Sequence, residues 1–174
     1  MVITLPVPVI IILDIFGWLF IHLSMAYLFT RLPERLIEPD NHLFRSRSWE
    51  RDGDLYAQVF GVKRWKHFLP DGAALFAGGF RKKHLADTGT RYLHRFIIET
   101  CRGEAAHWAV ILCTPLFFVW NYGWANPIMV MYSLTANVPC ILTQRYNRLR
   151  LRNLLGRRLA HMERTITGKR GPDV

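Results

Sequence analysis

Three long runs with almost no charged side chains constrain the fold of this chain more than any other feature of its sequence. Asp14 is the one acidic or basic residue within 5–29, and residues 105–125 and 127–143 contain none. A helix of about 20 apolar residues crosses the hydrocarbon layer of a bilayer. We therefore predict an all-α integral membrane protein with about three transmembrane helices, at roughly 5–29, 105–125 and 127–144.

The length of the chain and its first apolar run limit the number of domains and spans that it can contain. With 174 residues the sequence has room for one domain, and we predict a single membrane-embedded domain over 1–174. The first run lacks the basic start and the cleavage site of a secretion signal, so we interpret it as a retained span. Cys101, Cys113 and Cys140 lie in or beside apolar segments, which is typical of unpaired thiols rather than of a disulfide framework or a zinc site.

The positively charged residues are confined to two segments, and their placement predicts the topology. All 23 lysines and arginines lie in these segments, 14 within 31–104 and nine within 145–170. Because basic residues concentrate on the cytoplasmic side of a membrane, we predict that the 31–104 segment and the basic tail at 145–174 are cytoplasmic. The N-terminus would then lie outside, and the second and third spans would form a hairpin with a short outer turn.

Within the predicted cytoplasmic segment, aromatic side chains alternate with cations between residues 55 and 83. This pattern favours amphipathic or re-entrant helical elements at the level of the lipid headgroups, with buried rings and with cations near lipid phosphates. The apolar stretch 73–80 is too short to span and is the candidate re-entrant element. A basic aromatic patch also suits nucleic acid, but the neighbouring spans favour lipid, and we predict no nucleic-acid partner.

A cluster of ionisable residues, FIIETCRGEAAHWAVIL, lies where the second apolar run begins. On a helix, Arg95, Glu99 and Arg102 share one face, so that the arginines bracket the carboxylate. Glu104 and His107 share another face, where the carboxylate would orient the imidazole and leave its other nitrogen as a general base. Ionisable groups in a membrane are costly and are therefore candidates for function. An equally open alternative is that these groups solvate a helix end and that His107 only caps it.

Two other chemistries fit parts of this cluster but lack a second element. A Glu-x-x-His pair such as Glu104 and His107 can form half of a metal site, but the sequence contains no second copy, so we predict no metal. Cys101 is a conceivable thioester nucleophile, yet only cations such as Arg102 would lower its pKa.

The third apolar run ends in the basic segment QRYNRLRLR. Arg145, Arg148 and Arg152 share a helix face there, and this geometry suits phosphate or carboxylate groups. The open alternative is that these arginines only mark the cytoplasmic end of the span.

Four stretches, two of which include residues discussed above, occur in a characteristic order: GVKRWKHFLPDG (61–72), RFIIETCRGEAAHW (95–108), FFVWN (117–121) and NVPCILTQRYNRLR (137–150). In these stretches the chain resembles small bacterial membrane enzymes, the glycosyl-4,4'-diaponeurosporenoate acyltransferases of staphyloxanthin-type carotenoid synthesis. The resemblance implies transfer of a fatty acyl group onto a sugar hydroxyl of a membrane-embedded glycolipid, in the plasma membrane of a bacterium. It implies no cofactor, because the acyl group would come from acyl-CoA or an acyl carrier as co-substrate.

The residues and the resemblance combine into one hypothesis, a membrane O-acyltransferase that works at the cytoplasmic leaflet. His107 is the predicted general base, Glu104 its orienting carboxylate, and Glu99 a further catalytic carboxylate. The predicted substrate-binding residues are Arg95, Arg102, Lys63, Arg64, Trp65, Lys66, Asn137, Gln144, Arg145, Asn147 and Arg148. The alternatives are another lipid-modifying enzyme with the same pocket and a non-catalytic membrane adaptor that recruits anionic partners. All of these are compatible with a homo-oligomer.

Overall fold

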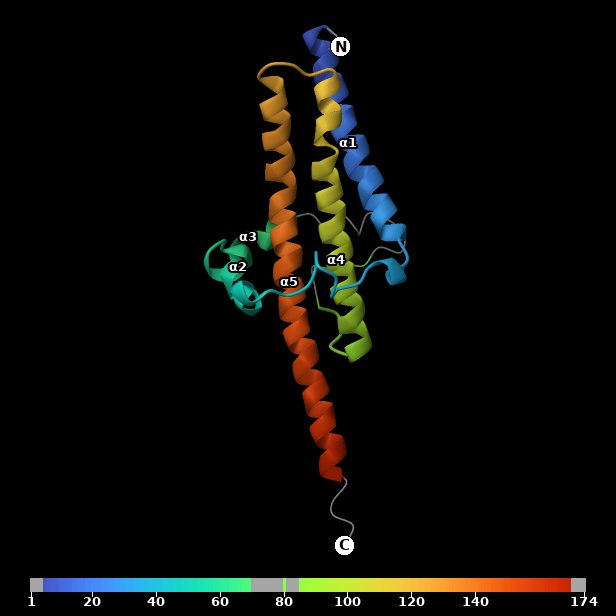
Figure 1. Ribbon diagram of the computed structural model, residues 1–174, viewed down its shortest axis with the longest axis vertical. Helices are drawn as coiled ribbons and strands as arrows, with labels where there is room; N and C mark the ends of the chain where they lie inside the picture. Colours follow the sequence, from blue (N-terminus) through green and yellow to red (C-terminus); the bar gives the residue numbers. More distant parts are fainter. Residues whose placement is uncertain (1–4, 70–79, 81–84, 170–174) are drawn as a thin grey trace.

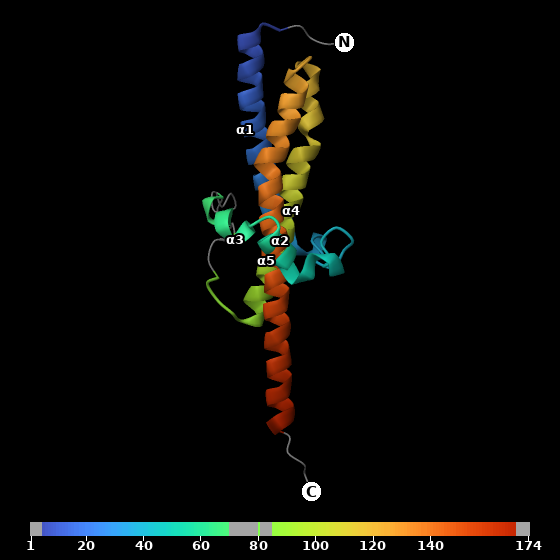
Figure 2. The same cartoon turned by 90° about the vertical axis from the view of Figure 1, so that its left-hand side faces the viewer.

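The computed structural model describes residues 5–69, 80 and 85–169, and every regular element in this part of the chain is helical. Three long helices dominate: α1 (Val7–Arg31), α4 (Thr90–Leu112) and α5 (Ala125–Lys169). They run side by side along an elongated bundle, and α4 contacts both of the others (Figures 1 and 2). Helix α1 begins at one end of this bundle, and α5 ends at the other.

The first helix has clear start and stop signals. Pro8 lies in its first turn, where a missing N–H removes no intrahelical hydrogen bond. Leu32, the residue after the helix, is extended with φ −60° and ψ 133°. Because Leu32 precedes Pro33, its helical conformation is disfavoured, and the helix ends at Arg31.

Within the described residues, two helices are long and apolar enough to cross a membrane, α1 and the Ala125–Thr167 part of α5. Only 17% of the apolar stretch of each helix is buried inside the molecule, so most of the side chains in these stretches face outward. Large exposed apolar surfaces are unfavourable in water and indicate membrane association. Helix α4 does not meet the same criterion, since residues 90–104 carry five charged side chains.

The predicted second span, one helix over 105–125, is wrong in its bounds. Helix α4 already begins at Thr90 and ends at Leu112, and the 3₁₀ helix η5 (Thr114–Val119) follows it. Pro115 prevents continuation of the α-helix because it offers no N–H to the carbonyl four residues earlier. The chain then turns through Gly123, whose φ is +55°, into α5.

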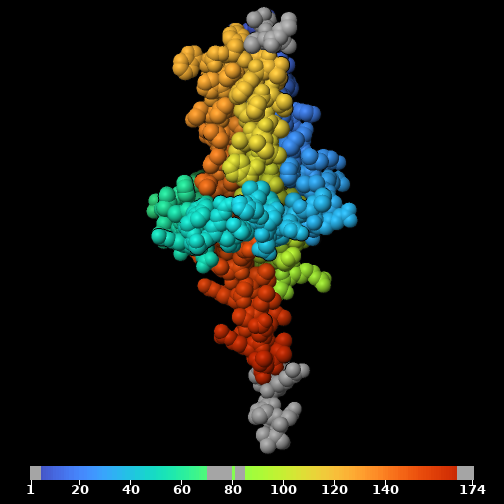
Figure 3. All heavy atoms as spheres, in the orientation of Figure 1, coloured from blue at the N-terminus to red at the C-terminus, as the bar shows by residue number. Residues whose placement is uncertain are grey.

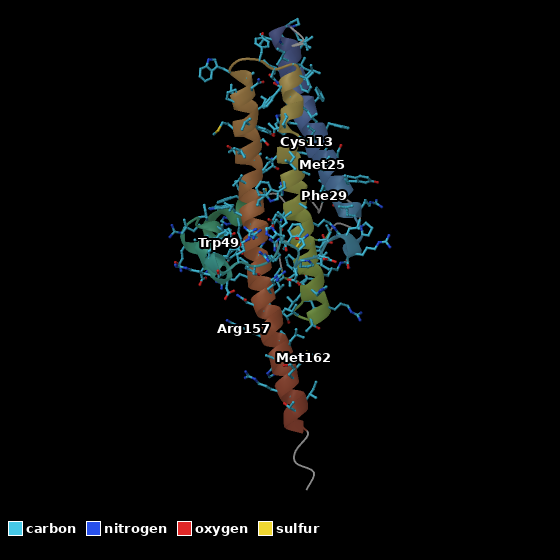
Figure 4. All side chains as sticks on the ribbon, in the orientation of Figure 1. Met25, Phe29, Trp49, Cys113, Arg157 and Met162 are labelled. Atoms are coloured by element: carbon cyan, nitrogen blue, oxygen red, sulfur yellow. The ribbon has the colours of Figure 1, made fainter. Side chains whose placement is uncertain are left out.

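Helix α5 contains the predicted third span, at 127–144, and extends well beyond it. Helix α5 continues to Lys169, so the residues predicted as a separate basic tail extend the same helix. Between Pro139 and Gly156 the sequence is rich in arginine and leucine, which are good helix formers, and it contains no glycine or proline. The last turns of α5 project beyond α4, where Arg157 and Met162 are labelled in Figure 4.

Residues 34–69 form a collar of short helices around the middle of the bundle. Its elements are η1 (Glu34–Leu36), η2 (Ser48–Gly53), α2 (Asp54–Gln58), α3 (Val62–Trp65) and η3 (Lys66–Phe68). In the space-filling view the collar is a band that crosses the long helices (Figure 3). The sequence predicts short helical elements within 31–104, and the collar contains them. The candidate re-entrant stretch 73–80 lies, apart from Phe80, outside the described residues.

In the described residues, several small apolar clusters join these elements. Trp18 of α1 packs against Val110 and Phe117, and Met25 and Cys113 flank this cluster (Figure 4). A polar contact lies nearer the η5 end of the same interface, where Trp120 Nε1 and Asn121 Nδ2 both donate to Oδ1 of Asp14, at 2.9 and 2.7 Å. These contacts attach α1 to the α4–η5 segment.

Two other clusters attach the collar to the long helices. Tyr56 and Val62 of the collar pack against Tyr146 and Leu149 of α5. The opposite side of the collar packs against α4. There, Ile37 and Phe44 of the collar are buried against Ile98 and Cys101 of α4. The collar is therefore fixed at the level where the basic part of α5 begins.

Candidate active site

A buried network of charged side chains links the collar, α4 and α5. Glu104 of α4 is 1% exposed and accepts hydrogen bonds from two arginines of α5. Arg145 Nη1 lies 3.1 Å from Glu104 Oε1, and Arg148 Nη2 donates to Oε2 of the same carboxylate. Arg145 Nε also donates to Oε1 of Glu50 from the collar. In the protein interior, where the dielectric constant is low, each of these charges requires its partner, because either charge alone would strongly destabilise the fold.

The arginines of α5 also bind backbone carbonyls of the collar. Arg145 Nη1 donates to the carbonyl oxygen of Leu43 at 2.9 Å, and Arg152 Nη2 donates to that of Pro39 at 2.6 Å. Arg152 is also paired with Asp40 at 2.8 Å. These guanidinium groups therefore hold the collar in place. They also donate hydrogen bonds to backbone carbonyls that have no helical partner in its irregular backbone.

Glu50 is completely buried and was not a predicted site residue. Its Oε2 accepts from the backbone N–H of Arg47 at 2.7 Å, and its Oε1 accepts from the hydroxyl of Tyr56 at 2.7 Å. Burial raises the pKa of this carboxyl, but hydrogen bonds from Arg145, Tyr56 and Arg47 outweigh burial, and the net pKa is lowered. No sequence pattern around Glu50 distinguishes it from the exposed acidic residues of the same segment.

A second buried ion pair on α4 joins Glu99 and Arg102, as their helical spacing predicts. Arg102 donates to Glu99 one turn before it, and its Nη2 also donates to the carbonyl oxygen of Leu32 at 2.7 Å, just after α1. Arg95, predicted as the other partner of Glu99, instead lies 3.9 Å from Glu34 at an exposed position. The predicted bracket is therefore half formed, and its role is to hold the end of α1 against α4.

His107 lies opposite Asn137 of α5. The ring Nδ1 is 2.9 Å from Asn137 Oδ1, and Asn137 Nδ2 donates to the carbonyl oxygen of Ser133 at 2.9 Å. One turn farther along, the hydroxyl of Thr114 donates to that of Ser133 at 2.8 Å. Asn137 is fully buried, so its amide has one orientation that satisfies both of its ends.

This arrangement assigns the tautomer of His107. Because the Asn137 amide nitrogen is used by Ser133, its oxygen faces the imidazole, and an oxygen of this kind only accepts hydrogen bonds. The proton of the neutral ring is therefore on Nδ1, and the lone pair is on Nε2. An imidazole held in this way can accept a proton at Nε2. The orienting group found at Nδ1 is the amide of Asn137, whereas both carboxylate oxygens of the predicted partner, Glu104, bind arginines.

The remaining predicted substrate-binding residues divide by exposure. Lys63 and Arg64 of α3 are exposed, whereas Lys66 Nζ donates to Asn147 Oδ1 at 3.0 Å and lies over the ring of Tyr146. Trp65 Nε1 donates to the carbonyl oxygen of Phe60 at 2.8 Å. Together with the exposed Arg95, Lys63 and Arg64 are the predicted cations left open to solvent, because Arg102, Arg145 and Arg148 are buried against carboxylates.

Level with the ion network, α5 carries a further polar group. The Oε1 of Gln144 is buried and, in the part of the chain that the structure describes, has no hydrogen-bond partner. Along α5, Asn147 is ten residues from Asn137, which corresponds to about 15 Å. The exposed cations of α3 are therefore offset along the helix from the His107–Asn137 pair.

The structure supports neither a nucleophilic cysteine nor a metal site near the His107–Asn137 pair in the described residues. Cys101 is fully buried, and burial raises the pKa of its thiol, although Arg148 lies 3.7 Å from the sulfur. A nucleophilic cysteine needs a lowered pKa and access, and Cys101 has neither. Among residues 5–69, 80 and 85–169, no three or more His, Cys, Asp or Glu side chains are grouped as a metal site.

Comparison with known proteins defines the class of this chain. Residues 40–157, from the collar to beyond the ion network, match the glycosyl-4,4'-diaponeurosporenoate acyltransferase family, and the chain belongs to this family. It is therefore an acyltransferase, as the resemblance of its four segments predicts, and the adaptor alternative is excluded.

Relatives at this level of similarity include staphylococcal enzymes. The glycosyl-4,4'-diaponeurosporenoate acyltransferase of Staphylococcus aureus strain USA300 is 37% identical over 140 residues, which are 79% of this chain and 83% of the relative. The proteins of the same description from strains NCTC 8325 / PS 47 and bovine RF122 / ET3-1 are 37% and 36% identical over the same lengths. No solved structure matches the chain.

Proposed function

We propose that this protein transfers a fatty acyl group from a thioester donor onto a sugar hydroxyl of a glycosylated diaponeurosporenoate or a closely similar membrane glycolipid. The observation that carries the proposal is the His107–Asn137 pair, in which the amide oxygen of Asn137 faces Nδ1 of the imidazole and favours, for the neutral ring, the tautomer with its lone pair on Nε2. The acceptor is the one named for the staphylococcal relatives. The donor, acyl-CoA or an acyl carrier, follows from the chemistry, since acyl transfer to a hydroxyl needs an activated acyl group.

In the proposed reaction His107 is the general base. Its Nε2 removes the proton of the acceptor hydroxyl while the oxygen attacks the thioester carbonyl carbon. The carbon–sulfur bond then breaks, and the imidazolium returns the proton to the leaving thiolate, so that an ester and a thiol are the products. Asn137 is a positioning residue, because it touches the imidazole and not the substrate. Glu104 and Glu99 serve in this mechanism as charge partners of arginines that hold α4 in register.

The proposed placement has the N-terminus outside and three spans: α1, the part of α4 after Glu104 together with η5, and α5 up to about residue 145. The 31–104 segment and α5 beyond residue 145 would be cytoplasmic. Tyr146 lies 21 positions after Ala125, which is about 32 Å along the helix and matches a hydrocarbon layer of about 30 Å. The acceptor would enter from the lipid. The donor would arrive from the cytoplasm with its phosphates at Lys63 and Arg64, beside Trp65, Lys66, Gln144 and Asn147.

The test is acyl transfer by purified variants in lipid vesicles, measured as the added acyl mass on the acceptor by mass spectrometry. General base catalysis typically contributes 10² to 10⁴ in rate, so His107→Ala should lower turnover by roughly that factor. His94→Ala is the matched control, because it removes an exposed histidine from the same helix. If His107→Ala turns over at a rate near that of His94→Ala, His107 is not the base.

The positioning role of Asn137 is tested by two replacements of similar size. Asn137→Leu removes the acceptor for the Nδ1 proton and should lower turnover strongly. Asn137→Asp keeps an acceptor oxygen at Nδ1 and should restore part of it. A merely structural role predicts the opposite order, since leucine suits a buried helix interface better than a carboxylate does. Supplying acyl-CoA and acylated carrier protein in parallel identifies the donor.

A further inference from the structure

The collar carries large apolar side chains that point away from the rest of the molecule. Leu36 is 63% exposed, Val59 68%, Phe60 46% and Phe68 78%. They come from η1, from the turn after α2 and from η3, all of which belong to the band that Figure 3 shows across the long helices. Apolar side chains scattered on a surface are ordinary, but four on one band of short helices indicate a surface that contacts something apolar.

The level of the collar along the bundle identifies what it contacts. Val62 of α3 packs against Tyr146 of α5, and Tyr146 lies about 32 Å along the helix from Ala125. Since the hydrocarbon layer is about 30 Å thick, a span that starts at Ala125 leaves the hydrocarbon where the collar is attached. Both ribbon views place α3 on the side of α2 nearer to the start of α1, which is the side of the bilayer (Figures 1 and 2).

The charges of this band suit the same surface. Arg31, at the end of α1, is exposed and lies 5.3 Å from the ring of Tyr27, and Arg35 of η1 is exposed beside Leu36. Cations next to apolar side chains at this depth can contact lipid phosphates while the apolar groups enter the acyl region. The chain as a whole carries net charge +10, which favours an anionic leaflet.

We infer that the collar is a lipid-binding surface, which inserts Leu36, Val59, Phe60 and Phe68 into the cytoplasmic leaflet and places Arg31 and Arg35 on its phosphates. This inference depends on the membrane placement proposed above. It gives the collar a function in the reaction. With Tyr146 at the surface, Asn137 lies nine residues or about 14 Å deeper, so the collar fixes how far the imidazole of His107 is from the cytoplasm.

The test measures the surroundings of single nitroxide labels on the full chain, in vesicles of phosphatidylglycerol and phosphatidylcholine. The labels are attached at Phe60→Cys, Phe68→Cys and Leu159→Cys, with Cys113 and Cys140 replaced by alanine. Leu159 is the matched control: it is 46% exposed, as Phe60 is, but it lies on the part of α5 that projects beyond α4. Collisions with oxygen, which concentrates in lipid, are compared with collisions with a water-soluble nickel chelate.

We expect the labels at 60 and 68 to show more collisions with oxygen and a several-fold loss of collisions with nickel, relative to the label at 159. Equal nickel accessibility at 60, 68 and 159 would overturn the inference. The result is independent of the proposed reaction, because label accessibility is read without substrate. Turnover of the labelled proteins, measured separately, would report on the reaction and also show that each label leaves the fold intact.

Discussion

The ion network at Glu104 makes a quantitative prediction about stability. Replacement by glutamine keeps the shape of the side chain and removes its charge. Arg145 would still be paired with Glu50, but Arg148, which is 1% exposed, would lose its only carboxylate partner in the described residues. The variant Glu104→Gln therefore leaves the guanidinium of Arg148 without a counter-charge in the protein interior and also removes the attraction between Arg145 and Glu104.

The magnitude follows from the distances. Two unit charges 3.1 Å apart, the separation of Arg145 Nη1 and Glu104 Oε1, attract by about 5 kcal/mol at an effective dielectric constant near 20. The hydrogen bonds that glutamine can still accept recover part of this. Breaking a buried pair from one side typically costs about 3–5 kcal/mol, and we expect Glu104→Gln to fall within that range. Glu34→Gln, in the exposed pair with Arg95, should cost less than about 1 kcal/mol.

The assay is reversible unfolding in mixed micelles, followed by tryptophan fluorescence, with wild type, Glu104→Gln and Glu34→Gln compared under one condition. If Glu104→Gln loses no more stability than Glu34→Gln, the network does not hold the helices together and the reasoning fails. The double variant Glu104→Met, Arg148→Met replaces the pair with apolar side chains and should recover much of the loss. Turnover by that refolded variant would then show whether Glu104 contributes to chemistry as well as to structure.

Three further predictions concern Glu50, the interface of α1 and an exposed glycine of α5. Because the pKa of Glu50 is lowered from its ordinary value of 4.5, the stability that this carboxylate contributes is present above that pH and is lost as the pH falls through the lowered pKa. The free energy of unfolding, measured on acidification, should therefore fall less steeply for Glu50→Gln than for the wild type. A Cβ at Gly17 would lie 3.0 Å from Phe117 Cε1, so Gly17→Val should destabilise the protein by about 1–3 kcal/mol in the same unfolding assay. Gly156→Ala, where a Cβ meets nothing within 4 Å in a helix, should instead stabilise it by up to about 1 kcal/mol, and a loss of stability there would contradict this account.

The sequence by itself determined the features that depend on neighbours along the chain. The apolar runs gave the membrane-length helices α1 and α5, since hydropathy is a property of consecutive residues. The spacing of Glu99 and Arg102 predicted their pair, because residues three apart meet on any helix. Four short segments were sufficient for the family, which residues 40–157 confirm.

Only the tertiary structure decided which groups meet across helices. Glu50 reaches Arg145 across 95 positions of sequence, and Asn137 reaches His107 across 30, and no local spacing encodes either contact. The same packing turned two arginines that looked suited to phosphate into buried partners of Glu104. The physical reason is that a buried charge must find a counter-charge, and where it finds one depends on the register of α4 against α5 and on the path of the collar.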